Sequence, residues 1–184
     1  MADILCVYYS RSGKTRNTMT AVAGALGAEL VEITDGVDRS GVRGAVRSCF
    51  DAVRRSTRFL EPFHTEKAVK DYELVIIATP IWAGRCCSVV REFLKKYGRD
   101  CRKTAYVITR SVEKDHQEQV FDQMDSYMAR PRICAASIRS GSVGETFWRD
   151  RFVQELKEKM AQPMAEELEE EDYGKMFAGE SNEE

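Results

Sequence analysis

Short apolar runs alternate along this chain with longer segments in which apolar residues recur every three or four positions. A short apolar run indicates a buried strand, and the longer spacing indicates a helix with one buried face. Strands that alternate with helices form βαβ units, in which the strands are parallel. We therefore predict an α/β fold, with strands at 4–9, 29–33, 74–78, 105–108 and 133–138 and helices at 13–27, 42–53, 89–97, 113–128 and 152–160.

Right-handed connections turn such a succession into a doubly wound sheet with helices on both faces, a three-layer sandwich. We predict one domain over residues 1–162, followed by an acidic tail over 163–184. The tail holds nine of the 30 acidic residues and one of the 28 basic residues, which leaves the domain with a net charge of about +6. Such a tail is typical of a solvated chain end.

Several classes of protein are disfavoured by what the sequence does not contain. The N-terminal region has neither a basic leader nor a long apolar stretch, so we expect a cytoplasmic protein with no membrane partner. The six cysteines show no C-x-x-C spacing, which favours reduced thiols. The two histidines are far apart and the basic residues are dispersed, so we expect neither a metal site nor nucleic-acid binding.

A hydroxyl-rich loop follows the first strand. It reads Ser-Arg-Ser-Gly-Lys-Thr-Arg-Asn over residues 10–17 and leads directly into the first helix. Free backbone N–H groups at a helix N-terminus, together with hydroxyl groups, suit a phosphate, and Gly13 allows a close approach of the backbone. The same residue types also suit an ordinary helix cap, so the loop alone leaves both interpretations open.

Three rival motifs fail on spacing or order. A Walker A loop needs a glycine five positions before Gly13, where Tyr8 lies within the strand, and no G-x-G-x-x-G follows the first strand. The stretch that begins at Ser140 faintly resembles a hydrolase nucleophile elbow. That class places its histidine after the serine, whereas His64 and His116 both precede Ser140.

The third strand ends in Thr-Pro-Ile-Trp-Ala-Gly-Arg over residues 79–85. In an open parallel sheet, ligands bind beyond the carboxyl ends of the strands. A large aromatic side chain at such an end, Trp82, followed by the small Ala83-Gly84 step, suits a flat ring system. The alternative is a tryptophan that only packs under a loop.

Together, the two loops resemble those of the flavodoxin family. Residues 10–15 are similar to its phosphate loop, [ST]-x-[ST]-G-x-T, and residues 71–84 resemble the strand and ring-binding loop of its bacterial members. The resemblance covers residues 3–160 and implies a flavodoxin-like sandwich with strand order 2-1-3-4-5 that binds flavin mononucleotide (FMN). It further implies a phosphate site made by Ser10, Arg11, Ser12, Gly13, Lys14 and Thr15. The resemblance also implies a ring site made by Pro80, Ile81, Trp82, Ala83 and Gly84.

A third family loop should follow the fourth predicted strand, at Thr109, Arg110 and Ser111. In relatives this loop is often glycine-rich, whereas residues 109–119 contain no Gly, Tyr or Trp. The chain also departs from the acidic low-potential carriers of the family, because it has basic residues in the phosphate loop (Arg11, Lys14, Arg16) and beside the ring loop (Arg85).

The resemblance implies that electrons move through the flavin without a catalytic side chain, since the cofactor carries the redox chemistry. We expect an electron carrier between protein partners. Small size and the lack of a recognisable nicotinamide site favour that hypothesis. The alternatives are an NAD(P)H-dependent FMN or quinone reductase, which the basic surroundings favour, and a flavodoxin-shaped domain that has lost its flavin. The sequence predicts no oligomeric state.

Overall fold

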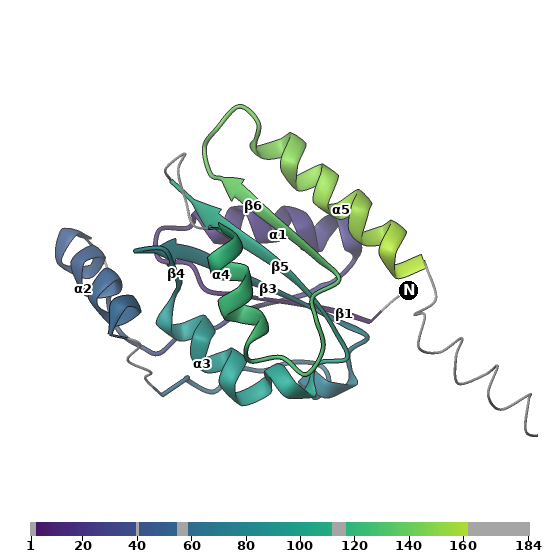
Figure 1. Ribbon diagram of the computed structural model, residues 1–184, viewed down its shortest axis with the longest axis horizontal. Coiled ribbons are helices and arrows are strands. Elements are labelled where there is room, and N and C mark those ends of the chain that lie inside the picture. The colour runs from purple at the N-terminus through teal and green to yellow at the C-terminus, as the bar shows by residue number, and fades with distance from the viewer. Residues whose placement is uncertain (1–2, 40, 55–58, 112–116, 162–184) are drawn as a thin grey trace, which may run out of the picture.

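A parallel five-stranded sheet forms the centre of the computed structural model, which describes residues 3–39, 41–54, 59–111 and 117–161. The sheet order is β2-β1-β3-β5-β6 (Figure 1). Its strands are β1 (Ile4–Tyr8), β2 (Glu29–Glu32), β3 (Leu74–Trp82), β5 (Lys103–Arg110) and β6 (Cys134–Arg139). The five strands predicted from the sequence are therefore all present, in the predicted order and orientation.

Helices cover both faces of the sheet (Figure 1). One face packs on α1 (Lys14–Leu26) and α5 (Glu145–Ala161), and the other on α3 (Ser88–Tyr97) and α4 (Gln117–Asp125). The side chains of β1 point alternately into two hydrophobic cores, one on each face of the sheet. Cys6 belongs to the same core as Met19 of α1, and Val7 to the same core as Phe93 of α3. This alternation follows from the two-residue period of a strand, and it confirms the predicted three-layer sandwich.

Several elements differ from the sequence prediction. β3 is longer than expected and continues through Trp82, where it pairs with a short antiparallel strand, β4 (Arg85–Cys86), that the sequence did not indicate. β5 likewise continues to Arg110, so part of the expected third loop is strand. Two single 3₁₀ turns, Val69–Asp71 and Gly98–Asp100, precede β3 and β5. The predicted start of the 113–128 helix and the acidic tail at 163–184 lie outside the described residues.

The helix α2 (Gly41–Val53) lies at the margin of the sheet beside β4 and α3 (Figure 1). A helix was predicted here, and its apolar stripe would ordinarily face the core. The structure shows the reverse, since the side chains of Val46, Phe50 and Val53 are exposed, whereas Ser48 and Asp51 are buried.

Buried charges explain this orientation. The Arg39 guanidinium is almost fully buried and binds the Asp35 carboxylate at 2.6 Å and the Asp51 carboxylate, on the inner face of α2, at 3.3 Å. Arg91 of α3 is also buried and donates hydrogen bonds to the backbone carbonyl oxygens of Asp51 and Ala52, both at 3.4 Å. Buried charges require such partners, and these partners lie on the polar side of α2.

Within the described residues, no helix has the length and apolar character needed to cross a bilayer. In the same part of the chain, no group of three His, Cys, Asp or Glu side chains is placed to hold a metal ion.

Candidate functional site

The carboxyl ends of β1, β3 and β5 surround a cavity of about 310 Å³. A volume of this size is at the lower end of the range for small-molecule sites. Twelve of its thirteen lining residues come from the three segments that the sequence singled out, and the set comprises Arg11, Ser12, Lys14, Thr15, Pro80, Ile81, Trp82, Ala83, Gly84, Thr109, Arg110, Ser111 and Ser140. Segments separated by up to about 100 positions meet here because parallel strands end at one edge of the sheet.

The loop after β1 presents the start of α1 to this cavity. Gly13 is the N-cap residue in a left-handed conformation, with φ of +83°, and offers no side-chain cap. A Cβ atom added at Gly13 would have no other heavy atom within 4 Å, so the backbone there faces open space. The first backbone N–H groups of a helix have no partner within the helix, and they carry the positive end of its dipole. This end of α1 can therefore hold an anionic group.

Ser10 occupies a different position from the rest of the loop. Its hydroxyl oxygen accepts a hydrogen bond from the backbone N–H of Arg16 at 3.2 Å, and the residue lines a neighbouring cavity between β1 and β2 rather than the main one. Arg16 also points away, because its guanidinium binds the Glu32 carboxylate at 2.6 Å. Ser10 thus supports the first turn of α1.

The segment after β3 is a hairpin, and it forms one wall of the cavity. Trp82 pairs with Arg85 across it, and the linking residues Ala83 and Gly84 have φ of +48° and +69°. Two central residues with positive φ define a type I′ turn, in which glycine is favoured and alanine is strained. Two hydrogen bonds hold the hairpin in place. The Cys87 backbone N–H donates to the Thr79 hydroxyl at 3.1 Å, and the Cys86 backbone N–H donates to the side-chain oxygen of Gln123 at 3.4 Å.

Trp82 combines the two roles that the sequence left open. Only 8% of its surface is exposed, and its ring packs edge-on against Tyr9 with 5.6 Å between the centroids. It also lines the cavity. Tyr9 and the surrounding core therefore hold the ring in place, and the small part of Trp82 that borders the cavity can contact a flat aromatic ligand.

The end of β5 joins the phosphate-type loop to the rest of the site. The hydroxyl groups of Thr15 and Thr109 lie 2.8 Å apart in a buried position, and the Lys14 ammonium lies 3.4 Å from the Ser111 hydroxyl. Arg110 lines the cavity and donates from Nε to the Ser137 hydroxyl at 3.0 Å. This third segment thus contributes polar contacts and one cation.

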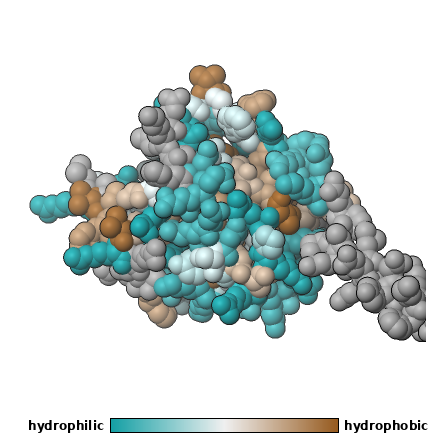
Figure 2. Space-filling view, in the orientation of Figure 1, coloured by the Kyte–Doolittle hydropathy of each residue, from teal (hydrophilic) through white to brown (hydrophobic). Residues whose placement is uncertain are grey.

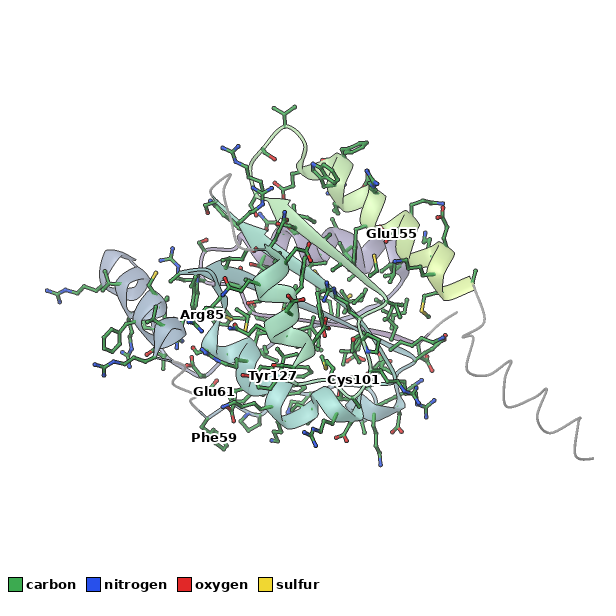
Figure 3. The ribbon with its side chains drawn as sticks, in the orientation of Figure 1. Phe59, Glu61, Arg85, Cys101, Tyr127 and Glu155 are labelled. Atoms are coloured by element: carbon green, nitrogen blue, oxygen red, sulfur yellow. The ribbon has the colours of Figure 1, made fainter. Side chains whose placement is uncertain are left out.

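The cavity is positively charged. Among the described residues, its lining includes the cations Arg11, Lys14 and Arg110 and no carboxylate. Arg85, expected from the sequence to add to this charge, is not among the lining residues; Figure 3 places it on the side of the hairpin that faces α2.

Sequence reasoning missed Ser140 as a contributor to the site. It follows β6, lines the cavity, and has a buried hydroxyl oxygen with no hydrogen-bond partner among the described residues. A buried hydroxyl is ordinarily paired, so this one can serve a ligand or a water molecule in the cavity. Its position beyond a strand end was the only signal available in the sequence.

The neighbouring thiols are poor candidates for nucleophiles. Burial raises the pKa of Cys86 to about 12 and also raises the pKa of Cys87, so both remain protonated near neutral pH. The chemistry that this site can support is therefore the binding of an anionic, partly aromatic molecule.

Comparison with known proteins identifies the fold. No family model and no curated protein sequence matches the chain. Solved structures do: a flavoprotein from Lactobacillus acidophilus in complex with FMN is 16% identical, with a TM-score of 0.64 over 83% of this chain and 99% of its own. A WrbA-like flavodoxin from Agrobacterium tumefaciens is 13% identical, with a TM-score of 0.56 over 86% and 99%. An NADH:FMN oxidoreductase is 11% identical, with a TM-score of 0.56 over 90% and 91%. The chain therefore has the flavodoxin-like fold.

Proposed function

We propose that this protein binds FMN at the cavity beyond β1, β3 and β5 and transfers electrons through it. One observation carries the proposal: the start of α1 with Gly13 as its N-cap, the tryptophan Trp82 and three cations all border one cavity, whose described lining contains no carboxylate. The solved structures with this fold, one of them in complex with FMN, support the same conclusion.

The residues present fit the parts of FMN. The phosphate would lie against the start of α1, near Ser12, Gly13, Lys14 and Thr15, where the helix dipole and Lys14 compensate its charge. The ring would lie against the hairpin wall at Trp82. The unpaired Ser140 hydroxyl offers an additional hydrogen bond. When bound, FMN accepts and releases electrons, and the protein's part is to bind, orient and electrostatically bias it.

We propose an electron carrier as the primary role, with a redox protein as partner. No second site of a kind that would seat a nicotinamide dinucleotide was evident from the sequence. The second candidate is an NAD(P)H-dependent FMN or quinone reductase. The cationic lining of the cavity favours it, because an anionic cofactor would be attracted. The similarity of fold to an NADH:FMN oxidoreductase is compatible with this second role.

The visible spectrum of the purified full-length protein tests the proposal. We expect flavin absorbance, or a calorimetric titration with added FMN that saturates at a Kd of about 10 μM or tighter. An absence of both would mean a flavodoxin-shaped domain without a flavin and would remove the proposal. If FMN binds, steady-state oxidation of NADH and NADPH with quinone or free FMN as acceptor then separates reductase from carrier.

A further inference from the structure

A second cavity, of about 350 Å³, is bordered by α5 and the edge strand β6. Its volume falls within the range for small-molecule sites. We call it the α5 cavity, and its described lining comprises Arg110, Gln117, Ala135, Ala136, Ser137, Trp148, Arg151, Phe152 and Glu155. Arg110 also lines the proposed FMN cavity, and its Nε donates to the Ser137 hydroxyl at 3.0 Å. A molecule bound in the α5 cavity would therefore lie beside the FMN cavity.

One side of α5 forms a wall of the α5 cavity. Arg151, Phe152 and Glu155 follow Trp148 by three, four and seven residues, which places all four on the same side of the helix. Phe152 is buried in the core and anchors this side, whereas Trp148 and Arg151 are exposed. The facing side chains of β6 are small and leave the space open, and they belong to Ala135, Ala136 and Ser137.

Trp148 provides an aromatic surface in this lining. Its exposed fraction is 48%, and its ring packs edge-on against Phe147 with 5.4 Å between the centroids. Figure 2 shows brown, hydrophobic atoms at the top of the molecule, where Figure 1 places the loop between β6 and α5. A half-exposed indole that lines a cavity can stack on a planar heterocyclic base.

The polar groups of the lining complement the other parts of a nucleotide. The Arg151 guanidinium lies 5.5 Å from the centre of the Trp148 ring, and within the described residues it forms no ion pair. Together with Arg110 it supplies two guanidinium groups, whose planar sets of donors suit phosphate oxygens. The one carboxylate of the described lining, Glu155, is compensated by Lys159 at 2.9 Å. A carboxylate in such a site can accept hydrogen bonds from ribose hydroxyl groups.

We propose that the α5 cavity binds the adenosine diphosphate (ADP) moiety of a dinucleotide electron donor, NADH or NADPH. The adenine would stack on Trp148, and the diphosphate would lie toward Arg151 and Arg110. Because Arg110 lines both cavities, the nicotinamide half can continue from there toward the FMN cavity. The inference rests on the reductase candidate above, to which it adds a site for the donor. Binding of ADP itself is measurable with or without FMN.

Trp148 is a built-in probe for the base. In a Trp82→Phe protein it is the single tryptophan. Titration with ADP should quench its fluorescence saturably, with a Kd of about 0.1–1 mM, because the adenine stacks on the indole. Inorganic pyrophosphate lacks the base, so it should compete with ADP without quenching Trp148.

Calorimetric titration of the full-length protein with ADP, before and after saturation with FMN, separates the two cavities. ADP in the α5 cavity should bind with similar affinity in both titrations, because FMN occupies the other cavity. ADP whose diphosphate lies at the start of α1 would instead be displaced by the phosphate of FMN.

Substitutions on α5 test the assignment of the residues. Arg151→Gln should weaken ADP binding about tenfold, as expected for the loss of one charge-assisted hydrogen bond. Trp148→Ala should weaken it at least about fivefold. Lys157→Gln is the matched control, because it removes the same charge from an exposed residue of α5 outside the lining, and it should leave the Kd unchanged. In steady-state assays, Arg151→Gln should raise the KM for NADH or NADPH more than it lowers kcat.

No saturable ADP binding by the FMN-loaded protein would overturn the proposal, and so would equal losses of affinity in Arg151→Gln and Lys157→Gln. Displacement of ADP by FMN would assign ADP to the FMN cavity and reject the α5 cavity as its site. ADP binding without any oxidation of NADH or NADPH would reject the dinucleotide donor as the occupant. Failure of the proposed electron transfer gives a different result, in which FMN does not bind while ADP binding persists, and the donor role is then removed with it.

Discussion

The hydroxyl groups of Thr15 and Thr109 lie 2.8 Å apart, in a buried contact between the first turn of α1 and the end of β5. This contact joins the phosphate-type loop to the third segment of the cavity. It also fixes how far the start of α1 stands from the rest of the site.

Thr109→Val should destabilise the protein by about 1–3 kcal/mol, because it leaves the Thr15 hydroxyl buried without a partner. Thr15→Val combined with Thr109→Val removes both hydroxyl groups and should recover much of that loss. Urea denaturation of the four proteins in a double-mutant cycle measures the coupling. Additive losses would show that the two hydroxyl groups do not depend on each other.

Substitutions at Gly13 should separate backbone strain from ligand contact. The φ of +83° disfavours valine strongly and asparagine much less, and no protein atom lies near an added Cβ. We expect Gly13→Val to lose both stability and FMN binding. Gly13→Asn should keep most of the stability and lose FMN affinity, since its side chain projects toward the proposed phosphate position. Calorimetric titration measures the FMN affinity, and thermal unfolding measures the stability. An unchanged FMN affinity in both variants would show that the phosphate binds elsewhere.

Trp82 should report FMN binding by its fluorescence. In a Trp148→Phe protein, Trp82 is the single tryptophan, and we expect strong quenching when FMN binds. In Trp82→Ala the remaining Trp148, outside the cavity lining, should be quenched much less, and affinity should fall by about 1–3 kcal/mol. Equal quenching in the two variants would place the ring site away from the hairpin.

The cationic lining should raise the reduction potential of bound FMN. A charge about 10 Å from the ring contributes roughly 0.4–1.7 kcal/mol at an effective dielectric constant between about 20 and 80. For a one-electron step this is about 20–70 mV. Arg110→Gln should therefore make the potential of the second reduction more negative by about that amount at low salt, and by less at high salt.

Arg99→Gln is the control for this measurement, because it removes the same charge at the opposite end of the sheet. Spectroelectrochemical titration of the three proteins gives the comparison. A potential that responds equally to both substitutions would remove the electrostatic interpretation. It would also remove the main reason for retaining a reductase as the second candidate.

Acid should destabilise the buried ion pair of Asp35 and Arg39. Burial alone would raise the pKa of Asp35, but the hydrogen bonds and charge of Arg39 outweigh it and hold this pKa below its ordinary value. The ion pair's contribution to the free energy of unfolding is fully present above the pKa of Asp35 in the unfolded chain, about 3.9. It is lost as the pH falls through the lower pKa of Asp35 in the folded protein. Asp35→Asn should cost about 3–5 kcal/mol near neutral pH, because Arg39 stays buried with fewer partners.

The measurement is the urea midpoint of wild type and Asp35→Asn across acidic and neutral pH. The difference between the two proteins should be largest near neutral pH and shrink at the acid end. A difference that stays constant with pH would mean that the substitution acts through packing alone.

The strands and the position of the cavity could be predicted because they depend on local patterns, whereas the strand order was implied by the resemblance to the flavodoxin family. A short apolar run rich in β-branched residues, such as residues 74–78, favours a buried strand, and a parallel sheet brings the residues after its strands to one edge. Twelve residues of the cavity lining were found from that rule and from two loop patterns. Only Ser140 was missed, because the one pattern that the stretch around it resembles, a hydrolase nucleophile elbow, fails on the order of serine and histidine.

The orientation of α2 and the charge distribution could not be predicted in the same way. An amphipathic pattern shows which residues share a face, whereas the face that packs inward was decided by two buried arginines outside the helix, Arg39 just before it and Arg91 of α3. Likewise, nothing local to Arg16 indicates its ion pair with Glu32, which removes it from the cavity. The hairpin turn was hidden because Ala83 replaces the asparagine or aspartate that usually precedes glycine there.

The hydrogen bonds from Arg91 to the carbonyl oxygens of Asp51 and Ala52 make α2 and the first part of α3 a single mechanical unit. Since α3 begins directly after the hairpin that carries Trp82, and α2 also contacts β3 and β4 of that hairpin, the Arg91 guanidinium is one of several links between α2 and this wall of the cavity. Release of that group would let α2 open as a local unit while the sheet remains folded, and hydrogen exchange would then be faster in α2 than in α1.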